Sequence, residues 1–233
     1  MMNADGTVQR ALTDDPAWDV YPVITPDGRY IVFASDRNGK AGLWRMDIDG
    51  NKLKRLTNAS SSSSYDVTPD GQSVIYTTVE ADKIVIRGMP IDGGSPVQIG
   101  VTTGSDSLCV SPDGKLLAYF SADPTARTGT KLAVMPVTGG SPVKTFDVLL
   151  GAAGSATDLK WSPDGRALVY IGPNPGGGAP ALWRQSLDGG APTLVADFSP
   201  DSIYAFAYSR DGKQLALVRG NQTSDAVLIS EVK

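Results

Sequence analysis

The chain has 233 residues, and its 21 Lys and Arg against 25 Asp and Glu give a formal net charge of −4. This acidic balance, without a basic stripe, argues against a nucleic-acid-binding function, while the length suffices for one large core. The chain contains no histidine, which excludes Ser-His-Asp catalysis, Cys-His catalysis and His-ligated metal sites.

Other features of the composition narrow the class of protein further. Cys109 is the single cysteine, so no intramolecular disulfide can form. No run of about 18 apolar residues occurs, so we expect no membrane span, and the first residues do not resemble a signal peptide. The chain has 23 Asp but only two Glu, and this preference for a turn-forming acid over a helix-forming one indicates an all-β, loop-rich fold.

A four-residue turn motif recurs along the chain at intervals of 43 to 51 residues. Its five copies are 25–28, 68–71, 111–114, 162–165 and 209–212. Pro presets the turn dihedral, Asp tolerates the next position, and Gly adopts the left-handed conformation of a tight hairpin. Arg210 replaces Pro in the fifth copy.

We interpret the Asp and Gly of each copy as structural turn formers, because a motif repeated across the whole fold belongs to the scaffold. These residues are Asp27, Gly28, Asp70, Gly71, Asp113, Gly114, Asp164, Gly165, Asp211 and Gly212.

The chain begins with residues 2–6, which match the end of a later repeat, residues 46–50, so residues 7–12 are predicted to be an unpaired outer strand. Five repeats follow, at about 18–57, 63–100, 106–146, 157–196 and 203–233. Each contains an inner strand before the turn, an apolar strand after it, a third strand, a Gly-bearing turn and a short, half-polar outer strand. Prolines and charges on the outer strands are typical of sheet edges that resist pairing with other chains.

The inner strands carry one apolar face and one mixed face. Positions such as Val67 and Val110 are apolar in every repeat, whereas the opposite face includes Asp66, Cys109 and Lys160. A mixed inner face is expected beside a solvated central channel. The second strands have apolar residues in succession, which indicates that both of their faces are covered.

The last repeat stops after residues 227–232, which match the third strand, and so it lacks its own outer strand. We therefore predict a single all-β domain over residues 1–233: a β-propeller of five four-stranded blades, with the last blade completed by residues 7–12. The alternative is a fragment of a six- or seven-bladed propeller.

The five turn motifs, the Ser35–Gly39 segment and the Asp-Gly or Gly-Gly turns resemble the TolB-type propeller family built from WD40-like (PD40) repeats. The resemblance covers nearly the whole chain and specifies the fold better than the function. It implies a recognition scaffold in a bacterial, periplasmic or otherwise extracytoplasmic protein. Neither an α/β domain nor a hydrolase domain, which some relatives carry, is recognisable in these residues.

We expect ligands to bind at the mouth of the channel where the loops before the inner strands gather. The candidate binding residues are Trp18, Asp19, Asp66, Asp106, Asp158, Lys160 and Tyr204. Acids beside aromatic residues could hold a basic peptide segment or a cation such as calcium. The structural interpretation is that these loop aspartates only cap turns. We predict no organic cofactor.

We predict a non-catalytic module that binds a protein, a peptide or a small ligand and that is a monomer. The enzymatic alternative is a five-bladed glycosidase, which needs only two carboxylates, for example Asp66 and Asp158. A third possibility is the gating propeller of a peptidase.

Overall fold

The computed structural model describes residues 1–3, 5–57, 61–81, 83–104, 107–123, 125, 129–148, 158–209 and 211–221. For residues 61–63 only the backbone is described. All regular secondary structure in these ranges is β-strand. Within them, no helix of the length and apolarity needed to cross a membrane occurs.

Four of the sheets are four-stranded, antiparallel and built from consecutive strands. Blade 1 contains β1 (Asp19–Ile24), β2 (Tyr30–Ser35), β3 (Gly42–Asp47) and β4 (Lys54–Arg55). Blade 2 contains β5 (Ser61–Val67), β6 (Ser73–Glu80), β7 (Lys83–Pro90) and β8 (Val97–Thr102). Blade 3 contains β9 (Leu108–Val110), β10 (Leu116–Ala122), β11 (Thr130–Pro136) and β12 (Lys144–Asp147). Blade 4 contains β13 (Leu159–Trp161), β14 (Ala167–Gly172), β15 (Ala181–Ser186) and β16 (Thr193–Ala196).

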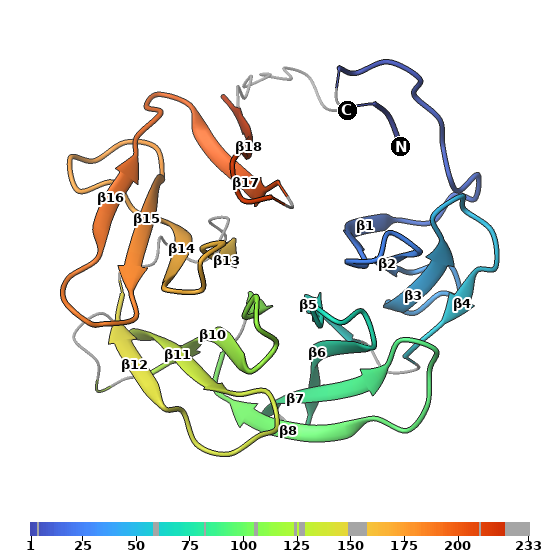
Figure 1. Cartoon of the computed structure of the whole chain (residues 1–233), viewed down its shortest axis with the longest axis horizontal. Helices are drawn as coiled ribbons and strands as arrows, with labels where there is room; N and C mark the ends of the chain where they lie inside the picture. Colours follow the sequence, from blue (N-terminus) through green and yellow to red (C-terminus); the bar gives the residue numbers. More distant parts are fainter. Residues whose placement is uncertain are drawn as a thin grey trace, which may run out of the picture.

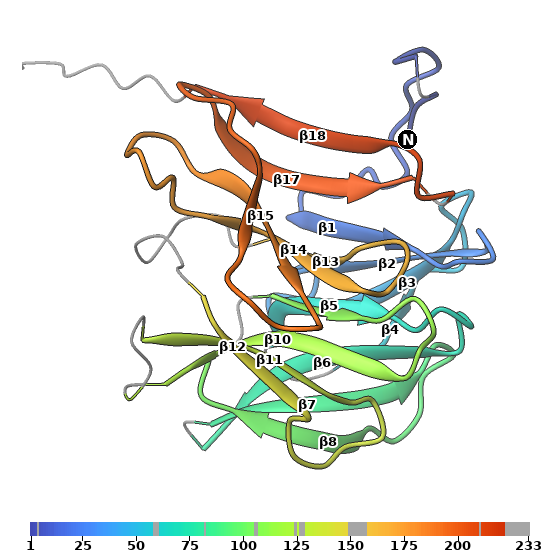
Figure 2. The same cartoon turned by 60° about the vertical axis from the view of Figure 1, so that its left-hand side comes forward.

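The blades are arranged around a common centre, with β1, β5, β9 and β13 innermost and β4, β8, β12 and β16 at the rim (Figure 1). Seen from the side, neighbouring sheets stack face to face (Figure 2). The predicted all-β propeller is therefore confirmed, as is the strand order within each complete blade.

The repeated turn has the geometry that its residues predict. In blade 4, the Ser162 hydroxyl donates to Asp164 Oδ1 at 2.5 Å and accepts the Ala167 N–H at 2.9 Å. Gly165 has φ +67°, in the left-handed region that favours glycine, and its N–H donates to the Ser162 carbonyl at 2.9 Å. The other four copies repeat the hydroxyl-to-carboxylate bond at 2.6 Å. In all five copies the Ser or Thr hydroxyl and the Asp carboxylate thus form the same hydrogen bond of the turn.

Most of the core lies between blades rather than within one. The contact of blades 3 and 4, for example, joins Phe120 and Leu132 to Leu159, Leu168 and Tyr170. Similar clusters join blades 1 and 2, blades 2 and 3, and blade 4 to the fifth unit. Because the two faces of a blade are covered by two different neighbours, strands such as β14 are buried along their whole length.

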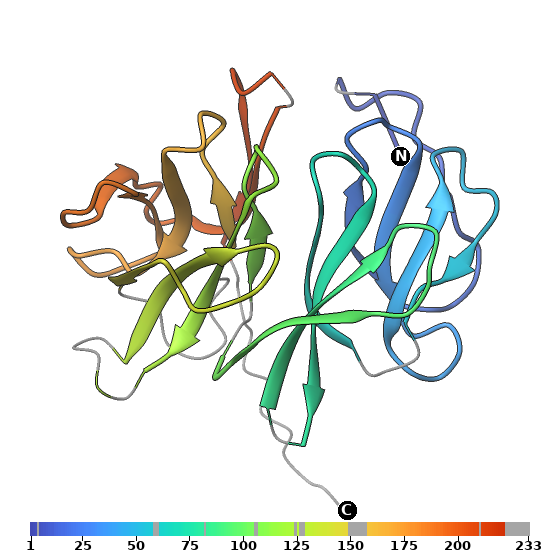
Figure 3. The same cartoon turned by 60° about the horizontal axis from the view of Figure 1, so that its bottom comes forward.

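The fifth unit is described only in part. Its described part is the two-stranded sheet of β17 (Ser202–Tyr208) and β18 (Leu215–Gly220). The predicted third strand, residues 227–232, lies outside the described residues. Figures 1 and 3 show an opening between this hairpin, in red, and the blue first blade. The structure thus shows four blades and part of a fifth.

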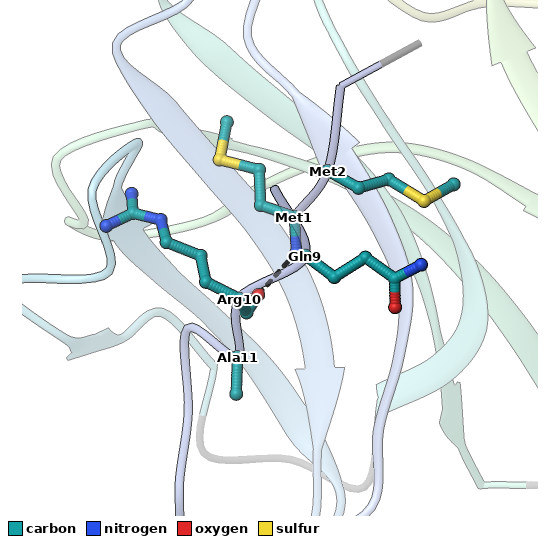
Figure 4. A pocket seen from close by; sticks show the side chains of 5 residues that line it. All are labelled: Met1, Met2, Gln9, Arg10 and Ala11. Carbon is teal, nitrogen blue, oxygen red and sulfur yellow. Dashed lines mark hydrogen bonds between the residues drawn. The ribbon is translucent and has the colours of Figure 1, made fainter. Parts of the chain in front are cut away.

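Residues 7–12, predicted to be the closing strand, are not a strand in the structure. Instead, Met1 and Arg10 exchange two backbone hydrogen bonds of 2.8 and 2.9 Å, so the N-terminal segment pairs with itself. The side chains of Met1 and Met2 extend from this loop beside Gln9 and Arg10 and line a shallow hollow (Figure 4). The backbone groups expected to meet residues 227–232 are therefore occupied by Met1.

Ser162→Ala should destabilise the protein more than Ser209→Ala, although both remove the same turn hydroxyl. Ser162 is buried, and its loss leaves the N–H of the buried Ala167 without an acceptor, which costs about 1–3 kcal/mol. In the more exposed fifth copy, water can replace the hydroxyl of Ser209. Urea unfolding of both variants checks this, and equal losses would contradict the role given to the buried turn.

The turn aspartates predict a loss of stability in acid. Ser or Thr hydroxyls lower the pKa of each of these carboxyls: Asp27, Asp70, Asp113, Asp164 and Asp211. A lowered folded-state pKa gives stability that is present above the unfolded value near 3.8 and is lost as the pH falls below it. We expect Tm to fall between pH 5 and pH 3, with a smaller fall for Asp164→Asn. A slope equal to that of the wild type in Asp164→Asn would contradict this account.

Candidate functional site

Side chains of the inner strands tie each blade to the next one. The Tyr65 hydroxyl of β5 donates to the carbonyls of Tyr21 and Val20 on β1. One blade further, Asp66 Oδ2 accepts the Val110 N–H of β9 at 2.9 Å, and its Oδ1 accepts the Val67 N–H at 2.8 Å. Asp66 is therefore a bridge between two inner strands.

The same kind of tie continues through blades 3, 4 and the fifth unit. Trp161 Nε1 donates to the Cys109 carbonyl at 3.1 Å, which joins β13 to β9. Asp158, directly before β13, accepts the Phe206 N–H of β17 at 3.0 Å through Oδ2. Its Oδ1 pairs with Lys160 Nζ at 3.0 Å. Each of these pairs of neighbouring inner strands is thus joined by a hydrogen bond between a side chain and the backbone.

Lys160 is the cation of this inner cluster, which we define as Asp66, Cys109, Asp158 and Lys160. Burial raises the pKa of Asp66, and the N–H of Val110 and the charge of Lys160 oppose that rise. Burial lowers the pKa of Lys160, but the carboxylates of Asp158 and Asp66 outweigh it, so the pKa is raised and the ammonium form is favoured. Burial, followed by the Asp66 charge, raises the pKa of Cys109 well above its usual value, so the thiol is not a reactive nucleophile.

A second charged group lies at the start of blade 1. Arg37 Nη2 binds both oxygens of Asp19 at 2.9 and 2.8 Å, and its Nη1 lies 3.1 Å from Asp15 Oδ2. The guanidinium also stacks over Phe33 and Trp44 at 5.2 Å from each ring centroid. Asp19 is therefore neutralised by a nearly buried arginine and is not a free acid at the mouth.

Trp18 is the most exposed of the predicted site residues that the structure describes. Its side chain is 79% exposed, yet its backbone is fixed because the N–H donates to Asp36 Oδ1 at 2.9 Å. Tyr204, on β17, is 42% exposed. Strand β1, which follows Trp18, and strand β17, which carries Tyr204, lie on opposite sides of the opening in Figure 1.

The structure therefore divides the predicted residues into two groups. Asp66, Asp158 and Lys160 come together around β9, whereas Trp18, Asp19 and Tyr204 lie on the strands beside the opening or directly before them. Asp106 lies outside the described residues. Among the described residues, no three His, Cys, Asp or Glu side chains are grouped so that they could hold a metal ion.

Sequence reasoning missed the cations that pair with the predicted acids. Arg37 binds Asp19. At Asp201, an acid outside the predicted set, Arg219 Nε lies 3.8 Å from Oδ2, and Asn221 Nδ2 donates to Oδ1 at 2.7 Å. Both arginines lie at or just after the end of a second strand, close to the first residues of the inner strand beside it. The hairpin register, which pairs Asp19 with Ser35, was the signal that could have identified Arg37.

We compared the chain with known protein families and solved structures. A family model described as the TolB beta propeller domain matches residues 1–147, which is more than half of the chain. The solved structure of a putative TolB from Agrobacterium tumefaciens superposes with a TM-score of 0.75 at 22% identity, over 94% of this chain and 76% of that one. At this identity the likeness concerns the fold alone.

Curated relatives match over short segments. An uncharacterized protein of Agrobacterium fabrum is 36% identical over 59 residues, which are 25% of this chain and 20% of that protein. The Tol-Pal system protein TolB of Bordetella pertussis is 42% identical over 45 residues, 19% of this chain and 10% of that protein. The matched segments thus span one fifth or less of these relatives.

The repeated turn, the four-stranded blades and the match of the family model to residues 1–147 agree with one another. The chain belongs to the TolB β-propeller (PD40) family.

Proposed function

We propose that this chain is a non-catalytic recognition module that binds a protein or peptide segment at the mouth of the propeller, through Trp18 and Tyr204. The observation that carries the proposal is the exposure of Trp18 on a fixed backbone. Two of the other tryptophans, Trp44 and Trp161, are buried at 7% and 6% exposure. Exposed Trp and Tyr side chains held by a rigid scaffold are typical anchors of protein interfaces.

The charges beside these aromatic residues support a peptide ligand more than an inorganic cation. Asp19 and Asp158 are each paired with a basic side chain, so the predicted acidic mouth is largely neutralised. By its resemblance to TolB proteins, we also propose an extracytoplasmic location. The five repeats support a monomeric ring of five blades, with the N-terminal segment as part of the last one.

The hydrolase alternative requires two carboxylates that are free to act on a glycosidic bond. Both oxygens of Asp66 accept backbone N–H groups, and Asp158 binds Phe206 and Lys160. These contacts support structural roles for both acids, and with them the binding proposal.

Peptide selection tests the proposed function. A random displayed peptide library is panned on the full chain, and the selected peptides are measured by fluorescence polarisation against Trp18→Ala, Tyr204→Ala and, as a control on the outer strand β16, Leu194→Ala. We expect affinity to fall at least about tenfold for the first two variants and to stay unchanged for the third. Selected peptides that bind Trp18→Ala and Tyr204→Ala as well as the wild type would overturn the proposal.

Lys160→Met should lower Tm at pH 7, because it leaves Asp66 and Asp158 without their cation. Without Lys160, the pKa of Asp66 rises further above its unfolded value, and protonation as the pH falls then relieves the loss. The difference in Tm between wild type and variant should therefore shrink from pH 7 to pH 5. Asp14→Asn, at an exposed acid, serves as a control that should leave Tm unchanged. A difference that does not depend on pH would contradict the electrostatic role of Lys160.

A further inference from the structure

We propose that Tyr21 is a further aromatic anchor of the recognition site, and that the site takes a peptide segment with an arginine or lysine side chain. The inference rests on the proposed recognition function and adds to it one residue and the charge of the partner. It is supported by the backbone conformation of Tyr21, by the exposure of its ring and by the charges beside Trp18.

Tyr21 lies in a β-bulge of the inner strand β1, where two residues of β1 stand opposite one residue of β2. Its φ of +55° is left-handed, a conformation that residues as bulky as tyrosine rarely adopt. The other non-glycine residues with positive φ that the structure describes, Val8, Lys52 and Ala81, lie in turns or bends. Tyr21 thus has this conformation within a strand, where a bulge changes the direction of a side chain.

Burial of the ring does not offset the strain at Tyr21. The residue is 62% exposed, so most of its apolar surface remains in water. Glycine would adopt the same φ without strain. Strained backbone conformations cluster at binding and active sites, and we therefore assign the ring of Tyr21 a role in binding.

Blade 2 holds the bulge in place. The Tyr65 hydroxyl of β5, the inner strand of the next blade (Figure 1), donates to the carbonyls of Tyr21 and Val20. Tyr65 is 8% exposed and belongs to the core cluster between blades 1 and 2. A packed side chain therefore fixes the backbone that carries the Tyr21 ring, and this lowers the ordering entropy that binding costs.

Strand β17 has a bulge that also carries a tyrosine. The register of β17 with β18 shifts between Ile203 and Ala205, so Tyr204 is the extra residue there. Tyr204 is 42% exposed. Each of the two inner strands that flank the opening in Figure 1 therefore carries an exposed tyrosine at a break in its regular pairing.

The charged group beside Trp18 has an excess of negative charge. Arg37 pairs with Asp15 and Asp19, and Asp36 accepts the Trp18 N–H. Three carboxylates therefore face one guanidinium, and the group as a whole stays negative although Asp19 is paired. This charge favours a cationic partner over an anionic one.

The exposed rings of Trp18 and Tyr21 suit the same kind of partner. Ammonium and guanidinium groups bind over the faces of such rings, as Arg37 does within this chain at 5.2 Å from the Trp44 centroid. In the part of the chain that the structure describes, no cation lies over Trp18 or Tyr21. The two residues are three positions apart, so their Cα atoms are at most about 11 Å apart, a distance that a short peptide segment spans.

Peptides selected on the full chain test the charge of the partner. We expect Arg and Lys to be at least about twofold more frequent in them than in the unselected library. Replacing the Arg by citrulline or the Lys by norleucine, which removes the charge, should lower the affinity at least about fivefold.

Selected peptides without this enrichment, or neutral analogues that bind equally well, would overturn the inference. The proposed function would still stand if those peptides lose affinity for Trp18→Ala and Tyr204→Ala. If no selected peptide depends on Trp18 or Tyr204, the proposed function fails and this inference fails with it.

Two substitutions at Tyr21 separate binding from folding. Tyr21→Gly relieves the left-handed backbone and Tyr21→Ala does not, so Tm should be higher for Tyr21→Gly by about 2 °C or more. Both remove the ring, so both should lower the affinity for selected peptides at least about tenfold. Lys52→Gly, at a left-handed residue in the turn between β3 and β4, is the control and should leave the affinity unchanged.

Tight peptide binding by Tyr21→Gly would overturn the role of the ring. Equal losses of affinity in Tyr21→Gly and Lys52→Gly would overturn it as well, because the loss would then follow from the backbone change. A lower Tm for Tyr21→Gly than for Tyr21→Ala would contradict the strain assigned to the bulge.

Discussion

The structure depends on one constraint: a four-stranded blade has two apolar faces and can bury them only against two other blades. The core clusters accordingly lie between blades. The side chains of fully buried residues such as Leu43 and Ile86 pack against a neighbouring blade. Because of this requirement, the apolar pattern of the strands makes the blades pack face to face around a common centre. It also explains why the second strands are apolar on both faces, a pattern otherwise typical of strands buried in parallel sheets.

Polar groups of the inner strands serve the same requirement. Asp66, Asp158 and Trp161 bind backbone groups of an adjacent blade, and Lys160 offsets the charge that the two half-buried acids bring to the centre. The acids that the sequence offers as catalytic candidates, Asp66 and Asp158, thus hold neighbouring blades together. Among the predicted binding residues, Trp18 remains exposed.

Much of the fold could be predicted from the sequence, because the repeated turn sets the hairpin positions and the apolar pattern sets the strands. The turn role of Asp164, for example, followed from local rules. The pairing of Asp19 with Arg37 did not, since it depends on which loop ends meet across a hairpin. The self-paired conformation of Met1 and Arg10 was also missed, although the match of residues 2–6 to residues 46–50 contained the necessary signal.

Hydrogen exchange of the native chain tests most directly whether every blade face is covered in solution. The amides of β2 and β3 should be protected as strongly as those of β10 and β11, because the account requires both faces of blade 1 to be covered, like those of blade 3. Exchange in β2 and β3 that is faster by about tenfold or more than in β10 and β11 would show that blade 1 keeps an open face, and would contradict the account.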